Sequence, residues 1–216
     1  MKVNEIFSSI DGEGLRTGEL ATFIRLAGCN LNCSYCDTEY ARGKDSGNDM
    51  TVEQIIDKVK SMKVKNITIT GGEPLIHKDV DKLIDKLLLN KYNINIETNG
   101  TVDIEKYLNR CLITMDYKCT SSLMESKMLL SNLEKLTEND VLKFVVQEKD
   151  FECMKEVLQK YNLKCYVYIS PIFGKIELCK IVDFMKECNK ESINMAKLRM
   201  QVQLHKIIWD PNERGV

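Results

Sequence analysis

Two spacings of apolar residues alternate along the chain, and each is typical of one kind of secondary structure. Short apolar runs such as 66–70 and 140–146 indicate strands, and stretches with apolar residues at helical spacing follow them. The capping-box pattern Thr51-Val52-Glu53-Gln54 marks the start of one such helix. We predict strands at 1–9, 21–28, 66–70, 92–97, 111–116, 140–146 and 164–170. We predict helices at 51–62, 79–89, 104–109, 122–136, 151–161 and 176–188, and an extended segment at 201–209.

This alternation predicts the fold class. Strands that alternate with helices of about ten to fifteen residues form βαβ units and a parallel sheet. The chain has about six such units, fewer than the eight of a closed barrel. We therefore predict α/β architecture as a partial, open (βα)6-type barrel, in a single domain over 1–216. Residues 42–49 are predicted to form a surface loop, and about 199–216 a C-terminal extension.

Polar motifs follow several of the predicted strands. They are Cys29–Cys36, Gly71–Glu73, Thr98–Gly100, Asp116–Lys118 and Ser170–Pro171. In α/β folds the carboxyl edge of the sheet is where ligands bind. We therefore expect these motifs to surround one ligand site.

Three cysteines, Cys29, Cys33 and Cys36, have the spacing Cys-x3-Cys-x2-Cys. Thiolates are the usual ligands of iron–sulfur clusters, and a four-iron cluster held by three cysteines keeps one iron open. A disulfide would leave one of the three unpaired. A zinc site usually shows two Cys-x2-Cys-like pairs, so a distant cysteine or His205 would have to supply the fourth ligand. The spacing favours the open cluster, with zinc as the alternative.

The composition narrows the possible partners. Lys+Arg 31 against Asp+Glu 32 gives a net charge of −1, which does not favour nucleic acid. The chain shows no apolar run of membrane-spanning length and no signal-peptide pattern at its beginning. Nine cysteines without such a signal indicate a reducing compartment, and we interpret the six outside the loop as buried thiols. We expect a cytoplasmic protein that binds neither nucleic acid nor membranes.

The cysteine motif, with Tyr35 before its last cysteine and Gly71-Gly72-Glu73 after the next strand, resembles the radical S-adenosylmethionine superfamily. The resemblance implies a [4Fe–4S] cluster on the three cysteines, whose open iron chelates S-adenosylmethionine. Electron transfer from the reduced cluster then cleaves this cofactor and gives a 5′-deoxyadenosyl radical that abstracts hydrogen. The resemblance also implies the cofactor-binding residues, which are Tyr35, Cys36, Asp37, Gly71, Gly72, Glu73, Asp116, Tyr117, Lys118, Ser170 and Pro171.

Four further motifs resemble the 7-carboxy-7-deazaguanine synthases: Ser8–Gly14, Phe23-x-Arg25-Leu26-x-Gly28-Cys29, Cys36-Asp37-Thr38 and Gln203–Trp209. The resemblance implies a lyase of the queuosine pathway that converts 6-carboxy-5,6,7,8-tetrahydropterin to 7-carboxy-7-deazaguanine with loss of ammonia. Magnesium, regenerated S-adenosylmethionine, a flavodoxin or ferredoxin as electron donor and a homodimer are implied as well. Asp11 departs from the glutamine that many members carry, and the tail 211–216 is longer than in some.

The same resemblance implies roles around the substrate. Arg25 is expected to be catalytic, because its planar guanidinium can form two parallel hydrogen bonds to the substrate carboxylate. The alternative is a structural ion pair. Thr38 is expected to be catalytic as a magnesium ligand, because magnesium prefers oxygen. The residues expected to contact the pterin are Ile10, Asp11, Gly12, Glu13, Arg25, Thr70 and His205.

Two other functions are compatible with a three-cysteine loop. One is another small radical enzyme, such as a glycyl-radical activase, which acts on a protein and has no need for Arg25 and residues 11–13 to face inward. The other is a cluster-based sensor or scaffold, or a zinc-binding interaction module, which would not cleave S-adenosylmethionine.

Overall fold

The computed structural model describes residues 1–191, 193 and 197–216. Its strands are β1 (Lys2–Ile10), β2 (Leu20–Leu26), β3 (Asn48–Asp49), β4 (Asn66–Gly71), β5 (Asn93–Thr98), β6 (Leu112–Tyr117), β7 (Val141–Val146), β8 (Tyr166–Pro171) and β9 (Leu198–Met200). Its α-helices are α1 (Val52–Met62), α2 (Val80–Leu89), α3 (Ser131–Lys135), α4 (Phe151–Lys160), α5 (Leu178–Lys190) and α6 (His205–Ile208). Short 3-10 turns lie at η1 (Glu39–Ala41), η2 (Pro74–Ile76), η3 (Glu105–Tyr107), η4 (Thr120–Ser122), η5 (Glu125–Lys127) and η6 (Glu148–Asp150).

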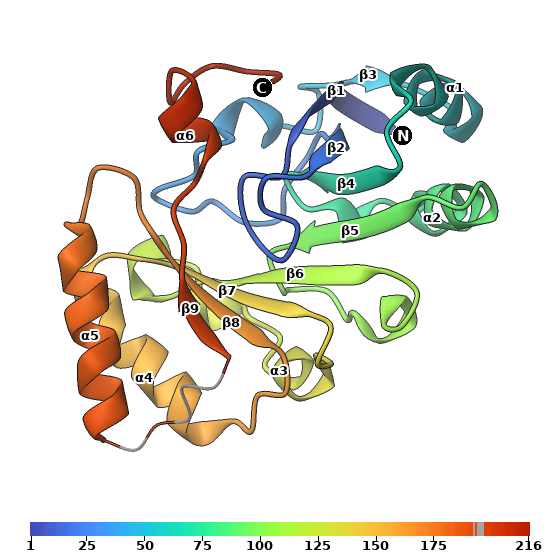
Figure 1. The fold of residues 1–216 in the computed structure, drawn as a ribbon. Helices are drawn as coiled ribbons and strands as arrows, with labels where there is room; N and C mark the ends of the chain where they lie inside the picture. Colours follow the sequence, from blue (N-terminus) through green and yellow to red (C-terminus); the bar gives the residue numbers. More distant parts are fainter. Residues whose placement is uncertain (192, 194–196) are drawn as a thin grey trace.

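The strands form one sheet in the order β3-β1-β2-β4-β5-β6-β7-β8-β9 (Figure 1). Neighbouring strands from β2 to β9 run parallel. Strand β1 runs antiparallel to β2 and β3. Because β3 and β9 lie at opposite edges, the described strands do not close into a ring. The predicted partial, open barrel is therefore confirmed, and the antiparallel edge is a feature that the sequence pattern did not reveal.

Helices α1, α2, α4 and α5 form where the apolar spacing predicts them, and each buries one face. In α1, the buried residues Val52, Ile55, Ile56 and Val59 join the core beneath the sheet. Thr51 caps this helix: its hydroxyl accepts from the Gln54 amide nitrogen at 3.2 Å, and its own amide donates to Gln54 Oε1 at 2.8 Å. The predicted capping box is confirmed.

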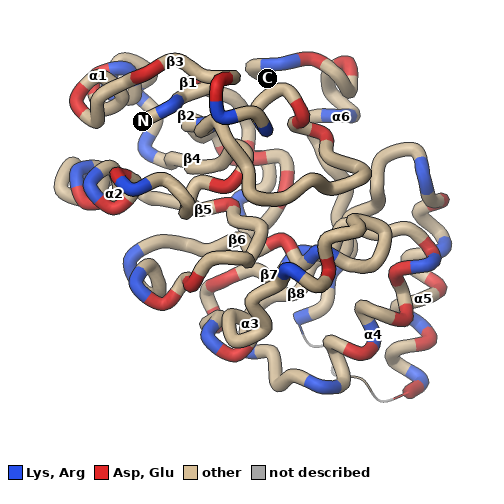
Figure 2. The backbone as a smooth tube through the Cα atoms, turned by 180° about the vertical axis from the view of Figure 1, so that it is seen from behind, with Lys and Arg blue, Asp and Glu red and all other residues tan. Residues whose placement is uncertain are grey.

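Charged residues of both signs alternate along the outer helices and turns (Figure 2). Several pair across neighbouring elements, as Lys86 of α2 does with Glu53 of α1, and Lys106 of η3 with Asp81 of α2. The surface is thus a solvated mixture of charges, in line with the net charge of −1. No helix in the described ranges is long and apolar enough to cross a membrane.

The prediction of one helix over 122–136 is wrong. The chain forms the turns η4 and η5 there, and only the short helix α3. Leu123 has a φ of 62°, a left-handed conformation that ends η4. Asn132 turns its amide inward and donates to the carbonyls of Gly100 and Val102, at 3.2 and 2.8 Å. This segment is therefore used to support the loop after β5 rather than to cover the sheet as a helix.

The extended segment predicted at 201–209 is also wrong. The strand β9 lies earlier, at Leu198–Met200, and the chain then crosses toward the N-terminal strands and forms α6 (Figure 1). The Leu204 amide donates to the Gly12 carbonyl at 3.2 Å. Contacts with the loop between β1 and β2, distant in sequence, thus decide the path of this segment.

The ends of β2 and β4 approach each other so closely that two glycines are required. A Cβ on Gly71, where φ is +135°, would lie 2.0 Å from the Leu26 carbonyl oxygen. A Cβ on Gly72 would lie 2.2 Å from the Gly28 carbonyl oxygen. Both obstacles are backbone atoms, which cannot rotate away as a side chain does. The Gly-Gly pair is therefore first a packing requirement between two strands.

We expect Gly71→Ala to destabilise the fold by about 3 kcal/mol or more, because the new methyl group collides with backbone at a disfavoured φ. Gly174→Ala is the matched control, since its φ is +70° and nothing lies within 4 Å of the added Cβ. Its cost should be only about 1 kcal/mol. Urea unfolding followed by circular dichroism measures both. Equal losses in the two variants would contradict the close-packing argument.

Candidate active site

A cavity of about 240 Å³ opens at the carboxyl ends of the parallel strands. Its walls include the loop between β1 and β2, the cysteine loop, and residues at the ends of β4, β5, β6 and β8. Most of the predicted motifs contribute, and the last one does so through Ile172 and Phe173, directly after Ser170–Pro171. The structure thus brings motifs from separate strands together around one space.

All three cysteines of the loop line this cavity, and none forms a disulfide. The loop is held by backbone hydrogen bonds at both ends, from Cys29 N to Arg42 O at 3.0 Å and from Ser34 N to Ser122 O at 3.1 Å. Among the described residues, no three His, Cys, Asp or Glu converge as the ligands of a single ion must. In a cluster each cysteine ligates a different iron, so such convergence is not needed. The arrangement therefore suits a cluster better than zinc.

The Cys29 sulfur also accepts two hydrogen bonds. The Leu31 amide donates to Sγ at 3.4 Å, and the Asn99 side chain donates at 3.7 Å. Donors of this kind tune the potential of a cluster through its sulfur ligands. Asn99 comes from the end of β5, so it connects a second predicted motif to the cysteine loop.

Gly71 and Gly72 line the cavity, but Glu73 does not. The Glu73 side chain is fully buried and accepts from Leu75 N at 3.0 Å, Thr98 Oγ1 at 2.8 Å and Asn99 N at 2.6 Å. The side chain thus joins the ends of β4 and β5 and begins the turn η2, while the expected contact of Glu73 with the cofactor stays a prediction. Burial raises the pKa of Glu73 to about 7, although the hydrogen bonds from these three donors act to lower it.

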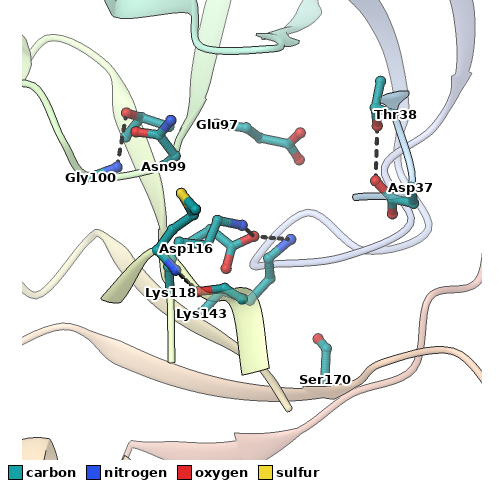
Figure 3. Close-up of polar contacts among 12 residues, drawn as sticks. Asp37, Thr38, Glu97, Asn99, Gly100, Asp116, Lys118, Lys143 and Ser170 are labelled. Carbon is teal, nitrogen blue, oxygen red and sulfur yellow. Dashed lines mark hydrogen bonds and ion pairs between the residues drawn. The ribbon is translucent and has the colours of Figure 1, made fainter. Parts of the chain in front are cut away.

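Asp116 and Lys118, at the end of β6, face the cavity as predicted. The Lys118 ammonium lies 2.9 Å from Asp116 Oδ2 and 5.7 Å from the centre of the Tyr35 ring (Figure 3). Asp116 Oδ1 and the Tyr35 hydroxyl are buried and have no partner among the described residues. The Tyr117 ring packs on Phe144 in the core, because alternate residues of a strand face opposite sides. The expected contact of Tyr117 with the cofactor stays a prediction.

Glu13 is the centre of a polar cluster in the wall. Its carboxylate accepts from Lys143 Nζ at 3.1 Å, Ser170 Oγ at 2.9 Å and Gln203 Nε2 at 3.3 Å. Ser170 is fully buried and is absent from the cavity wall, as is Pro171. The expected cofactor contacts of Ser170 and Pro171 stay predictions. In this structure the Ser170 hydroxyl positions Glu13.

Arg25 lines the cavity from β2. Its Nε donates to Glu5 Oε1 at 2.7 Å, and its guanidinium lies 5.8 Å from the ring centres of Phe7 and Tyr40. The structural ion pair considered above is thus present. The ion pair with Glu5 uses only Nε of Arg25. No residue that the structure describes accepts a hydrogen bond from the two terminal nitrogens, which can therefore bind another carboxylate.

Asp11 differs in position from the other residues expected to contact the substrate, and its expected contact stays a prediction. Its carboxylate is buried against Arg16, with an Nε–Oδ2 distance of 2.9 Å, and accepts from Thr68 Oγ1 at 2.8 Å. Its amide and carbonyl are used by Glu19 and Gly18 of the same loop, both at 2.8 Å. Asp11 does not line the cavity and instead holds the loop between β1 and β2 in place.

The other predicted substrate residues face the cavity. Those that line it are Ile10, Gly12, Glu13, Arg25, Thr38, Thr70 and His205, together with Asp37 of the cofactor set. Thr38 Oγ1 donates to Asp37 Oδ1 at 2.8 Å (Figure 3), and Lys206 lies 3.4 Å from Asp37 Oδ2. His205 packs directly on Gly12, where an added Cβ would lie 2.5 Å from Nδ1.

The charged residues that the sequence analysis missed include Lys143 and Glu97 in the cavity wall, and Glu5, the partner of Arg25. Glu97, in β5, lines the cavity and accepts from Thr70 Oγ1 at 2.7 Å. Lys143 interrupts the apolar run of β7, and an isolated charge in a buried strand was a signal that could have been used. Glu5 offered no comparable signal, because β1 has a mixed pattern of exposed and buried residues.

Comparisons with known proteins agree with this geometry. Residues 23–115 match the family model described as the Radical SAM superfamily. The crystal structure of QueE from Escherichia coli has the same fold, with a TM-score of 0.70 and 24% identity, over 94% of this chain and 93% of that one. The chain thus has the fold and the cysteine loop of a radical S-adenosylmethionine enzyme.

Sequence relatives identify the particular family. The chain is 47% identical to the 7-carboxy-7-deazaguanine synthase of Clostridium acetobutylicum, over 100% of this chain and 99% of that protein. It is 40% identical to the 7-carboxy-7-deazaguanine synthase of Methanospirillum hungatei, over 98% and 86% of the two chains. The chain belongs to the 7-carboxy-7-deazaguanine synthase family.

The raised pKa of Glu73 gives the stability a specific pH dependence. Because the pKa is about 7 in the folded chain and 4.5 ordinarily, the contribution of the protonated acid is fully present below about pH 4.5 and is lost as the pH rises through 7. Glu73→Gln mimics that acid. Between these pH values we expect the wild-type unfolding free energy to fall relative to the variant by on the order of 3 kcal/mol.

Urea unfolding at a series of pH values measures this difference. Glu105→Gln is the control, because the Glu105 side chain is 74% exposed and its pair with Lys135 is screened by solvent. A gap between wild type and Glu73→Gln that stays constant with pH would contradict the raised pKa.

Proposed function

We propose that this chain is a 7-carboxy-7-deazaguanine synthase. It would convert 6-carboxy-5,6,7,8-tetrahydropterin to 7-carboxy-7-deazaguanine with loss of ammonia, as a carbon–nitrogen lyase that regenerates S-adenosylmethionine. The observation that carries the proposal is that one cavity contains the three-cysteine loop, an available guanidinium at Arg25 and a buried carboxylate at Glu13. The relatives named above support the choice of reaction.

The cavity residues fit the two implied cofactors. Cys29, Cys33 and Cys36 would hold the [4Fe–4S] cluster. The buried, unpartnered Asp116 Oδ1 suits a hydroxyl donor such as that of a ribose, and the Tyr35 hydroxyl lacks a partner as well. Together the cluster and S-adenosylmethionine supply the radical that starts the reaction. Gly71 and Gly72 line the cavity, so a ligand can approach their backbone there.

Arg25 would bind the substrate carboxylate through its terminal nitrogens. Glu5 fixes the guanidinium by its Nε, and Phe7 and Tyr40 restrict it further. A fixed fork loses little freedom when it forms two parallel hydrogen bonds. Stacking of Phe7 on Phe23, with ring centres 5.0 Å apart, gives an apolar surface next to it for a flat ring.

Glu13 would accept hydrogen bonds from the guanidine-like edge of the pterin. The charge of Lys143 and the Ser170 hydroxyl hold the pKa of Glu13 below its ordinary value, although burial alone would raise it. The carboxylate form is the one that only accepts, which matches an edge of N–H groups. Ile10, Gly12 and His205 would complete this wall, and Thr70 with Glu97 would lie between substrate and cofactor.

Magnesium would bind at Thr38, beside Asp37. The two side chains are already hydrogen bonded at the cavity wall, and both offer the oxygen ligands that magnesium prefers. Substrate oxygens and water would complete its shell. This part of the proposal is supported by ligand chemistry and by family membership.

The remaining parts of the proposal concern the setting of the reaction. A flavodoxin or ferredoxin would supply electrons, the protein would act as a homodimer in the cytoplasm, and the product would enter queuosine biosynthesis. Family membership supports these statements. The rival enzyme, a glycyl-radical activase, is less compatible with the cavity, since Arg25 and Glu13 line it and an enzyme of that kind has no need for these residues to face inward.

One anaerobic assay tests the proposal. The reconstituted enzyme is mixed with dithionite, magnesium, S-adenosylmethionine and 6-carboxytetrahydropterin, and mass spectrometry detects the products. We expect 7-carboxy-7-deazaguanine only when every component is present. 5′-Deoxyadenosine without deazaguanine would overturn the substrate assignment, and neither product on a protein with full iron and sulfide would overturn the radical reaction.

In this assay we expect Arg25→Lys to lower kcat/KM on the order of 10- to 100-fold, because an ammonium cannot form the bidentate pair. Cluster content and uncoupled 5′-deoxyadenosine formation should persist. Arg110→Lys is the matched control, since Arg110 pairs with Asp85 at the surface, away from the cavity. Unchanged turnover of Arg25→Lys would count against the role of Arg25.

A further inference from the structure

Lys143 lies where a lysine is costly. Every residue of β7 is buried, and the Lys143 side chain is 11% exposed. Its neighbours Leu142 and Phe144 belong to the apolar core, while Lys143 itself points into the cavity. An ammonium without a partner in such a place would be strongly unfavourable. Its presence in the middle of this strand therefore calls for a function.

The ammonium lies between two carboxylates from other elements. Nζ is 3.1 Å from Glu13 Oε2, in the loop after β1. It is 3.8 Å from Asp116 Oδ2, in β6 (Figure 3). Burial alone would lower the pKa of Lys143, but these carboxylates and that of Glu97 hold it above its ordinary value. Lys143 thus remains charged, and its ammonium group interacts with carboxylates of the cavity wall.

The two carboxylates depend on Lys143 to different degrees. Asp116 has a second and closer cation, Lys118, at 2.9 Å. Glu13 pairs with no cation other than Lys143 among the residues that the structure describes. Asp37 and His205 also act on Glu13, but Asp37 is acidic, and burial lowers the pKa of His205, which leaves it neutral near pH 7. Loss of Lys143 would therefore affect Glu13 far more than Asp116.

Three donors fix the orientation of Glu13. A carboxylate offers about four acceptor positions, and Lys143, Ser170 and Gln203 occupy three of them. The open position lies on a carboxylate that lines the cavity. It suits an N–H donor, whereas a ligand carbonyl at the same place would face a like partial charge.

We infer that Lys143 is the positioning residue that makes Glu13 selective for a ligand with an amino group on its pyrimidine ring, against the analogue that carries a carbonyl there. This rests on the proposed function and adds a determinant of specificity to it. Lys143 acts through Glu13 and does not itself touch the substrate. Without it, Glu13 would gain a proton and could then donate to a carbonyl as well as accept from an amine.

The test compares two substrates in the anaerobic assay: 6-carboxytetrahydropterin and its 2-oxo analogue, the corresponding lumazine. The enzymes are the wild type, Lys143→Met, Lys143→Arg and the control Lys155→Met. Lys155 pairs with Glu191 at 2.6 Å on the outer helices and is absent from the cavity. The readouts are kcat and KM for each substrate, and uncoupled 5′-deoxyadenosine formation.

We expect the wild type to favour the amino substrate strongly, because an ionised Glu13 can only accept hydrogen bonds and a carbonyl at that place would leave it unpaired. Lys143→Met should reduce this preference on the order of 100-fold, mainly through KM for the amino substrate. Uncoupled 5′-deoxyadenosine formation should persist, because Asp116 keeps Lys118. Lys143→Arg should retain most of the preference, and Lys155→Met should match the wild type.

Two other outcomes would overturn the inference. Equal losses on both substrates in Lys143→Met would show a role in folding only, and an unchanged preference would show that Glu13 does not need Lys143. If Lys143→Met does not fold, Lys143→Gln takes its place, because it keeps a donor to Glu13 without the charge. A wild type that forms no deazaguanine product from either substrate would overturn the proposed function, and the inference with it.

Discussion

The geometry of the site depends on the backbone contact between the ends of β2 and β4. The amides of Gly72 and Glu73 donate to the carbonyls of Leu26 and Gly28, at 3.1 and 2.9 Å, through a gap too narrow for any side chain. Because the cysteine loop begins directly after β2, this contact sets where its first thiol stands relative to the sheet. Glu73 extends the arrangement to β5 with a buried carboxylate. The position of the cysteine loop is thus determined by the ends of the neighbouring strands.

The cavity wall combines buried charges of both signs. Glu13, Lys143, Asp116 and Lys118 form a continuous series of ion pairs from the loop after β1 to the end of β6. Buried pairs of this kind contribute little net stability, since desolvation offsets their attraction. Their value lies in preorganisation, because each group is oriented and ionised before a ligand arrives. The pair of Glu5 on β1 and Arg25 on β2 repeats the same principle.

The sequence was sufficient for those features that depend on local spacing. The strands, most helices, the capping box at Thr51 and the gathering of polar motifs at one edge follow from apolar periodicity and the parallel topology. Features that depend on distant partners were not predictable. The inward turn of Asn132 and the use of Ser170 to hold Glu13 are decided by contacts across the fold. Asp11 illustrates the same limit, because its partner Arg16 also donates to the carbonyls of Ile67 and Asn93 at the beginning of β4 and β5, contacts that no local pattern reveals.

The segment around α6 has a consequence for the order of events during synthesis. Gln203 and Leu204 reach back to Glu13 and Gly12, a separation of 190 residues between the hydrogen-bonded side chains. A ribosome makes the cysteine loop and most of the sheet long before it makes this segment. The cysteine loop therefore exists before the segment that completes the wall around Glu13 and Gly12. That wall, and the capture of a ligand by it, has to wait until nearly the whole chain has been made.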